Sequence, residues 1–198
     1  GADHVWRPGL MTAADLRAYR AIDRAPTRVG YRDLSIVSMG PPSSGGSTVG
    51  EAMNILDALR PAGREAGMHA FLEASRYSFA DRNAYLGDPR YTDVPLKGLL
   101  SDGFAATRAG LITDRAATSP VAAGDPYPFE GRSAPGPAAS GAPLVSPASS
   151  TTHLTVADKW GNVVSYTFTI ESTGGSGIVV PGYGFLLNNE LTDFNFDS

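Results

Sequence analysis

The sequence contains no cysteine and only three histidines among its 198 residues. Without cysteine the chain cannot form a disulfide, a thiolate nucleophile or a cysteine-ligated metal site, and it gives no information on the redox compartment. The histidines, His4, His69 and His153, are far apart in the sequence and lack the spacing of metal ligands. We therefore expect neither a metal nor a cofactor.

Basic charge and long hydrophobic runs are also scarce. Lysine occurs only at Lys97 and Lys159, and the net charge is -4, so no basic surface is expected and nucleic acid is not an expected partner. No apolar run approaches the ~20 residues of a membrane span. Since the chain does not begin with Met, the lack of a signal-peptide pattern carries no conclusion about export.

The sequence does contain enough apolar material for one folded domain, because 42% of its residues are hydrophobic and 9% are aromatic. Thr12, followed three residues later by Asp15, predicts a capped helix that runs through Leu16 and Tyr19. Residues 27–42, TRVGYRDLSIVSMGPP, predict two short strands around a polar turn. A mixture of helices and strands is therefore expected.

Two further helices are predicted between residues 43 and 89. The stretch SSGG indicates a glycine-rich structural turn, favoured over an anion-binding helix start, before a helix that ends at Pro61 and Gly63. In the longer helix after it, one face is apolar and charged side chains lie mostly elsewhere. The apolar face comprises Met68, Phe71, Leu72, Ser75 and Phe79. The charged set comprises Glu73, Arg76, Asp81 and Arg82, of which the last two, with Asp88, are expected to serve helix termination and ion pairing.

Residues 113–150 differ in composition from the rest of the chain. Ala, Pro, Gly and Ser dominate, and such a segment cannot bury enough surface to offset its own ordering. We predict a mobile connector here. A structureless stretch of this length inside a compact domain needs a reason, and we interpret it as a segment that ends where the chain is cut.

A β-hairpin is predicted directly after the connector. Its strands cover residues 151–157 and 162–170, and the turn between them gives Gly161 a positive φ. Pairing Asp158 with Asn162 creates a polar face, which pairs Thr155 with Ser165, His153 with Thr167 and Thr151 with Thr169. The opposite face is expected to point toward the core and pairs Thr152 with Phe168, Leu154 with Tyr166 and Val156 with Val164. A slip by one residue would mix the two faces, so the pattern selects the register.

Thr151 and Thr169 are thereby predicted to lie side by side, with Cβ atoms ~5 Å apart. A cross-strand threonine pair can be purely structural. Thr151, however, opens the predicted strand after a connector suited to cleavage, and a threonine at a chain N-terminus can be its own catalyst. Its α-amine, with an ordinary pKa near ~8, can act as general base toward its own hydroxyl. His153 and His69 are interpreted as structural or surface residues.

Two stretches, TTHLTVADKWGNVVSYTFTI and GSGIVVPGYGFLLNNELTDF, resemble the start of the small subunit of the γ-glutamyltranspeptidases, also called glutathione hydrolases. Three earlier stretches are similar to the end of that family's large subunit, in the same order: GLMTAADLRAYRAIDRAPTRVGYRD, PPSSGG and EASRYSFADRNAYLGDP. The resemblance covers nearly all of the chain outside the predicted connector.

This resemblance implies an α+β protein of the N-terminal nucleophile hydrolase type, an αββα sandwich that this chain holds only in part, as helices plus an antiparallel sheet. Residues 1–112 would be the C-terminal part of the large subunit, 113–150 the connector, and 151–198 the N-terminal part of the small subunit. The precursor is then expected to cut itself between Ser150 and Thr151.

The implied reaction is γ-glutamyl transfer to an amino acid or peptide, or hydrolysis, with glutathione or a related γ-glutamyl amide as donor and Thr151 as nucleophile. Thr169 matches the family threonine that hydrogen-bonds the nucleophile. Glu190 and Asp193 match acidic positions that hold the substrate's α-ammonium, which needs charged acceptors nearby. Glu171 stands where the family usually has Asn, so it still accepts from the ammonium but adds a negative charge.

The resemblance also implies groups outside the chain. The family's carboxylate-binding arginine is expected before Gly1, and its serine pair, oxyanion-hole glycines and lid after Ser198. Since each lost oxyanion donor costs ~3 kcal/mol, this middle fragment is expected to be inactive and uncut by itself. Its expected partners are the small-molecule substrate and the remainder of both subunits, and the implied location is periplasmic, secreted or cell-surface.

Two alternatives stay open. A related amidase of the same fold, such as a cephalosporin or glutaryl acylase, is compatible with Glu171 and with Gly174, which stands where the family commonly has an aromatic residue. A non-catalytic module, in which the hairpin is only a scaffold, is the third interpretation.

Overall fold

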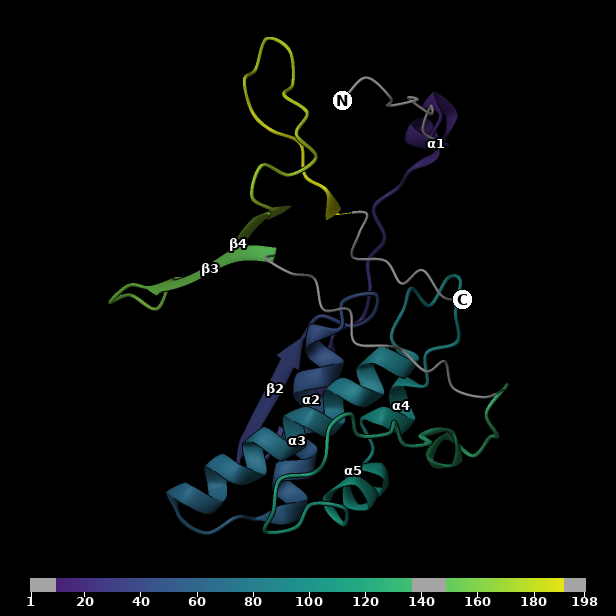
Figure 1. The fold of residues 1–198 in the computed structure, drawn as a ribbon, viewed down its shortest axis with the longest axis vertical. Helices are drawn as coiled ribbons and strands as arrows, with labels where there is room; N and C mark the ends of the chain where they lie inside the picture. Colours follow the sequence, from purple (N-terminus) through teal and green to yellow (C-terminus); the bar gives the residue numbers. More distant parts are fainter. Residues whose placement is uncertain (1–9, 137–148, 191–198) are drawn as a thin grey trace.

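The structure is a computed structural model that describes residues 10–136 and 149–190. Figure 1 shows a helical body beside a small sheet, and a separate hairpin that projects away from that body. The elements in chain order are α1 (Ala13–Ala18), β1 (Thr27–Tyr31), β2 (Leu34–Ser38), α2 (Gly45–Leu59), α3 (Arg64–Tyr85), α4 (Leu96–Leu99), α5 (Asp102–Ala109), the 3-10 helix η1 (Tyr127–Glu130), β3 (Ser149–Ala157) and β4 (Val163–Ser172). β1 pairs with β2 and β3 pairs with β4, both antiparallel. The predicted α+β class is confirmed.

The core of the helical body lies where α2 packs against α3 and α5. Ile55 of α2 and Ala74 of α3 are fully buried, and Ala105 of α5 is 1% exposed. Burial of a side chain such as Ile55 stabilises the fold by roughly 1.5–3 kcal/mol. Gly46 allows α2 to begin against the preceding chain, because a Cβ there would lie 2.2 Å from the Met39 carbonyl oxygen.

The predictions for residues 12–59 are confirmed with one exception. Thr12 caps α1 and forms a capping box with Asp15, and hydrogen bonds from Thr12 hold the pKa of Asp15 below its ordinary value. β1 and β2 are the two predicted strands. The predicted glycine-rich turn is wrong for Gly45 and Gly46, since both already belong to the first turn of α2.

The predicted faces of α3 are inverted in the structure. Its expected apolar face is between 45% and 57% exposed at Met68, Phe71, Leu72 and Phe79. In contrast, Glu73 is 2% exposed and Asp81 is fully buried. The side of α3 that is buried carries the small residues Ala70, Ala74 and Ser78, which let helices approach closely, and the two carboxylates gain partners from other segments.

One of these partners is Arg108 of α5, whose Nε lies 2.9 Å from Oδ2 of Asp81. The expected ion-pairing role of Asp81 is thus confirmed, but its role in helix termination is wrong, because α3 continues to Tyr85. Asp88 also pairs, with Arg24 at 2.9 Å.

The prediction of a structureless connector is wrong for residues 113–136. The Ala117 N–H donates to Oε2 of Glu73 at 3.0 Å, and the Gly124 N–H donates to Oδ1 of Asp81 at 2.6 Å. Tyr127, at the start of η1, is 4% exposed. Backbone amides in this segment satisfy the buried carboxylates of α3, so polar contacts order a stretch whose own apolar content is low. Residues 137–148 lie outside the described residues.

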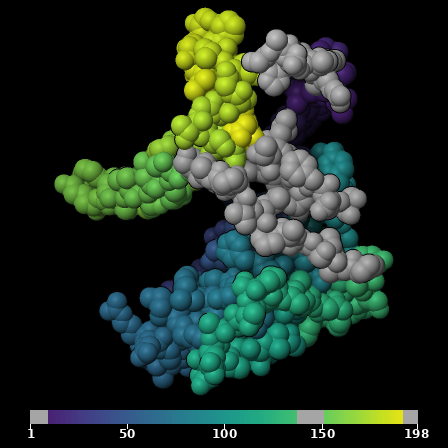
Figure 2. All heavy atoms as spheres, viewed as in Figure 1, coloured from purple at the N-terminus to yellow at the C-terminus, as the bar shows by residue number. Residues whose placement is uncertain are grey.

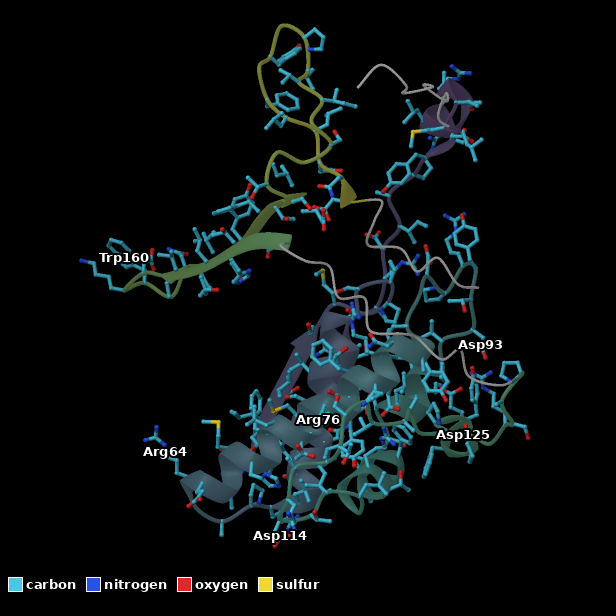
Figure 3. All side chains as sticks on the ribbon, viewed as in Figure 1. Arg64, Arg76, Asp93, Asp114, Asp125 and Trp160 are labelled. Atoms are coloured by element: carbon cyan, nitrogen blue, oxygen red, sulfur yellow. The ribbon has the colours of Figure 1, made fainter. Side chains whose placement is uncertain are left out.

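The predicted hairpin register is confirmed, including the opposition of Thr151 with Thr169. Gly161 has a φ of 88°, and Asp158 accepts hydrogen bonds from the N–H groups of Trp160 and Asn162, as a tight turn requires. Trp160 marks the tip of the hairpin, far from the helical body (Figure 3).

Two details of the hairpin differ from the prediction. Its expected core-facing side is exposed, with Phe168 40%, Tyr166 56% and Val164 60% exposed. The hairpin projects away from the helical body (Figure 2). β3 also begins earlier than expected, at Ser149, so Thr151 is not the first residue of its strand. Ser149 pairs with Ser172, and the register shifts between Ser149 and Thr151.

Candidate active site

The two paired threonines make a direct contact. The Thr151 hydroxyl donates to Oγ1 of Thr169 at 3.1 Å, across the strand pair and at the end of the hairpin opposite its turn. Both residues are exposed. The Thr151 hydroxyl is therefore held by the neighbouring strand, and Thr151 is still exposed on the surface.

The oxygen of Thr169 is also held from its own strand. The Glu171 N–H donates to Oγ1 of Thr169 at 2.8 Å. Glu171 has a φ of 68°, in the left-handed region, and the residue is 5% exposed. The same oxygen thus accepts from Thr151 on one side and from a main-chain amide on the other.

The Glu171 carboxylate lies in a small polar network. Its Oε2 accepts from the Ser172 hydroxyl at 2.6 Å and from the side-chain amide of Asn189. Asn189 was missed by sequence reasoning, which singled out only the acidic residues of NNELTDF. The side chain of Asn189, next to Glu190 in the sequence, carries both a hydrogen-bond donor and an acceptor, so it can anchor a nearby carboxylate and backbone amide. That capacity was the signal in the sequence that could have identified Asn189.

The remaining predicted site residues are placed as follows. Glu190 follows Asn189, whose Oδ1 accepts from the Ser172 N–H at 3.0 Å, so the Glu190 backbone lies near the end of β4. The Glu190 N–H donates to Oδ1 of Asn188 at 3.2 Å. Ser150 lies in β3 at the register shift, next to Thr151. Asp193 lies outside the described residues.

His153 belongs to the polar face of the hairpin. Its Nδ1 lies 2.7 Å from Oγ1 of Thr167, and its Nε2 lies 3.2 Å from Oγ1 of Thr155 and 3.1 Å from Oγ of Ser165. These contacts agree with its interpretation as a structural residue. His69 contacts the carbonyl oxygen of Thr113 at 2.7 Å on the surface of the helical body.

Within residues 10–136 and 149–190, no three His, Asp or Glu side chains gather in a way that could hold a metal ion. In the same ranges, no helix combines the length and apolarity needed to cross a membrane.

The sequence model of the γ-glutamyltranspeptidase family matches residues 2–198, nearly the whole chain. The chain belongs to the γ-glutamyltranspeptidase family. It is 40% identical over 191 residues to the glutathione hydrolase proenzyme of Bacillus subtilis, covering 94% of this chain and 32% of that protein. It is 35% identical over 193 residues to the acylase ACY 1 proenzyme of a Pseudomonas species, covering 96% of this chain and 31% of that protein.

Solved structures agree with membership of the γ-glutamyltranspeptidase family. The cephalosporin acylase of Bacillus halodurans aligns with 96% of this chain and 31% of its own, at a TM-score of 0.71 and 27% identity. The γ-glutamyltranspeptidase of Helicobacter pylori aligns with 56% of this chain and 33% of its own, at a TM-score of 0.52 and 33% identity. The expected fold class is confirmed, an α+β chain of the N-terminal nucleophile hydrolase type. The chain spans about a third of the length of these relatives.

Proposed function

We propose that this chain is the central part of a γ-glutamyltranspeptidase precursor that cuts itself between Ser150 and Thr151. Residues 1–112 then belong to the large subunit, 113–150 form the segment that leads to the cut, and 151–198 begin the small subunit. The observation that carries the proposal is the 3.1 Å contact between the hydroxyls of Thr151 and Thr169. Family membership supports it independently.

Cleavage changes the chemistry available to Thr151. In the uncut chain its nitrogen is an amide and cannot act as a base, whereas a freed α-amine has an ordinary pKa near ~8. That amine takes the proton of the Thr151 hydroxyl as Oγ1 attacks the γ-carbonyl carbon of the donor. The donor's amide C–N bond breaks, the proton passes to the leaving amine, and a γ-glutamyl ester remains on Thr151.

A second nucleophile completes the reaction. Water attacks the ester in hydrolysis, and the amine of an amino acid or peptide attacks it in transfer, and both restore the Thr151 hydroxyl. Thr169 keeps Oγ1 of Thr151 in place throughout. In the described residues this contact joins two neighbouring strands, which is a more rigid support than a loop would offer.

The acidic residues near the pair suit a donor with an α-ammonium. Glu171 and Glu190 lie on the segments that meet at the end of β4, and Asp193 follows them in the sequence. A buried ammonium needs charged acceptors at close range. The remaining partners are the small-molecule donor, its acceptor, and the rest of the two subunits.

Kinetics of the full-length protein with a γ-glutamyl anilide test this function. Thr151→Ala removes the hydroxyl and is expected to reduce kcat at least ~1000-fold. Thr155→Ala, on the same polar face but farther along the hairpin, is the matched control and should retain kcat within about threefold. Equal activity of Thr151→Ala and wild type would end the assignment of the nucleophile.

An acylase acting on glutaryl or related amides is the second candidate. The similarity to the acylase ACY 1 proenzyme and to cephalosporin acylase favours it, as does Glu171 at a position where the family usually has Asn. The same assay with a glutaryl anilide separates the two. A higher kcat/KM for the glutaryl donor would replace the γ-glutamyl assignment, whereas the main proposal expects the γ-glutamyl donor to be preferred.

A further inference from the structure

Three side chains of the helical body hold the main chain at Ala122 and Gly124, and we call them the clamp (Asp81, Tyr85 and Arg108). Nη2 of Arg108 donates to the carbonyl oxygen of Ala122 at 2.8 Å. The Gly124 N–H donates to Oδ1 of Asp81 at 2.6 Å, and its carbonyl oxygen accepts from the Tyr85 hydroxyl at 2.6 Å. These contacts all go to backbone atoms, so the clamp holds this stretch by its main chain.

The clamp residues are themselves fixed in place. Asp81 and Arg108 form an ion pair at 2.9 Å, and Asp81 is fully buried while Arg108 is 4% exposed. Burial raises the pKa of Tyr85 to about 12, so its hydroxyl keeps the proton that it donates. At Gly124 the space is closed, because a Cβ would lie 2.8 Å from the Phe104 ring and 3.1 Å from Nη1 of Arg108. The site therefore fits a main chain without a side chain at this position.

The clamp lies in the middle of a longer attached segment, which we call the strap (residues 117–132). At its first residue, the Ala117 N–H donates at 3.0 Å to Oε2 of Glu73, which is 2% exposed. At its last residue, Nη1 of Arg132 lies 2.6 Å from Oδ2 of Asp93. The strap is thus attached to the helical body at both ends as well as at the clamp.

Aromatic side chains add apolar contact to these polar ones. Tyr127 is 4% exposed and meets Tyr85 edge to face, with ring centroids 5.9 Å apart. Phe129 meets Phe104 in the same manner at 5.7 Å. Removing the strap from the body would expose these rings and would take the amide donors away from buried carboxylates. Both losses oppose its release.

We propose that the strap stays bound to the large subunit after the bond between Ser150 and Thr151 is cut, and that the clamp retains it there. The partners named above all belong to the helical body, so cutting that bond removes none of these contacts. The folded part of the large subunit then extends through Arg132 instead of ending at residue 112. This inference rests on the proposed self-cleavage and defines which part of the segment before the cut remains in place.

Hydrogen exchange of the full-length protein, measured by mass spectrometry, tests whether the strap stays bound. Cut wild type is compared with Thr151→Ala, which lacks the nucleophile and is expected to remain uncut. Peptides from residues 117–132 should exchange within about twofold of each other in the two proteins, and at least ~100-fold more slowly than an unfolded chain. Exchange at the unfolded rate in the cut protein alone would show that the strap leaves on cleavage, and it would overturn the inference.

Two substitutions test the clamp in the same measurement. Gly124→Ala places a Cβ against Phe104 and Arg108 and should raise exchange in residues 117–124 at least ~10-fold. Tyr85→Phe removes only the hydroxyl that donates to Gly124 and should raise it about threefold to tenfold. Exchange in residues 45–59, which form α2, should not change in either variant, because the body remains folded.

Gly136→Ala is the matched control. Apart from its chain neighbours, an added Cβ at Gly136 would meet no atom within 4 Å, so exchange in residues 117–124 should stay within about twofold of wild type. Equal exchange in Gly124→Ala, Tyr85→Phe and this control would overturn the role of the clamp while cleavage at Thr151 still stands. A wild-type protein that never yields a fragment beginning at Thr151 would overturn the proposed function and this inference together.

Discussion

Three buried charged residues, Glu51, Asp81 and Arg108, lie together inside the helical body, each no more than 4% exposed. Burial raises the pKa of Glu51 well above its ordinary value, and the nearby charge of Asp81 adds to this. Burial also raises the pKa of Asp81, but hydrogen bonding to Glu51, the Arg108 charge and the Gly124 amide oppose the rise. With one guanidinium for two carboxylates, Glu51 is the group that holds a proton while Asp81 pairs with Arg108.

The proton on Glu51 predicts a specific dependence of stability on pH. Because its pKa is higher in the folded than in the unfolded protein, its contribution to stability is complete below the unfolded value near 4.5 and is lost as pH rises through the folded value. Glu51→Gln mimics the protonated form and should differ from wild type by no more than ~1 kcal/mol at pH 5.

Thermal unfolding of the full-length protein at a series of pH values checks this expectation. The Tm of wild type should fall relative to that of Glu51→Gln as the pH increases. Glu65→Gln, an exposed position on α3, is the control and should run parallel to wild type. Parallel curves for Glu51→Gln as well would show that Glu51 is already ionised in the folded protein.

The hairpin and α3 show which elements a sequence can predict. The register of β3 and β4 followed from a period of two and from the Asp158–Asn162 turn, both of which are local signals. The orientation of α3 did not follow from its large apolar residues, because the partners of Glu73 and Asp81 come from Ala117, Gly124 and Arg108, which are distant in sequence.

The sequence likewise predicts one part of the candidate site and not the other. The opposition of Thr151 and Thr169 was predictable, since it depends on the register alone. The hydrogen bond from Asn189 to the Glu171 carboxylate and the left-handed φ of Glu171 were not, because both depend on how the chain after β4 folds back on the strand, and no local period marks that turn.

The 3-10 helix η1 packs against α4, and a substitution in α4 can test this contact. A Cβ on Gly98 would lie 2.2 Å from the carbonyl oxygen of Pro126, which is backbone and cannot rotate away. Gly98→Ala should therefore displace η1 and destabilise this part of the protein by about 1–3 kcal/mol, seen as faster hydrogen exchange in residues 124–132.

Gly67→Ala is the matched control, because this glycine lies inside α3 and an added Cβ would meet no atom within 4 Å apart from its chain neighbours and the backbone of its own helix. It should slow exchange or leave it unchanged, since Ala favours a helix by about 1 kcal/mol over Gly. Identical exchange in residues 124–132 for both substitutions would contradict the packing of η1 on α4.

At the scale of the whole molecule, the helical body and the hairpin each leave an apolar face exposed, on α3 and on the side of β4 that carries Tyr166 and Phe168. Exposed apolar faces of this kind are typical of surfaces that another part of a protein covers. The aligned relatives are about three times as long as this chain.

The central claim is that Thr151 becomes the N-terminal residue of a subunit and that Thr169 steadies its hydroxyl. The mass of the fragments formed by the purified full-length protein tests it most directly, with Thr169→Val beside Thr155→Val as the matched pair. We predict that wild type and Thr155→Val yield a fragment beginning at Thr151, and that Thr169→Val yields it at least ~10-fold more slowly. An intact wild-type chain, a cut at another bond, or equal rates for the two valine substitutions would contradict the account.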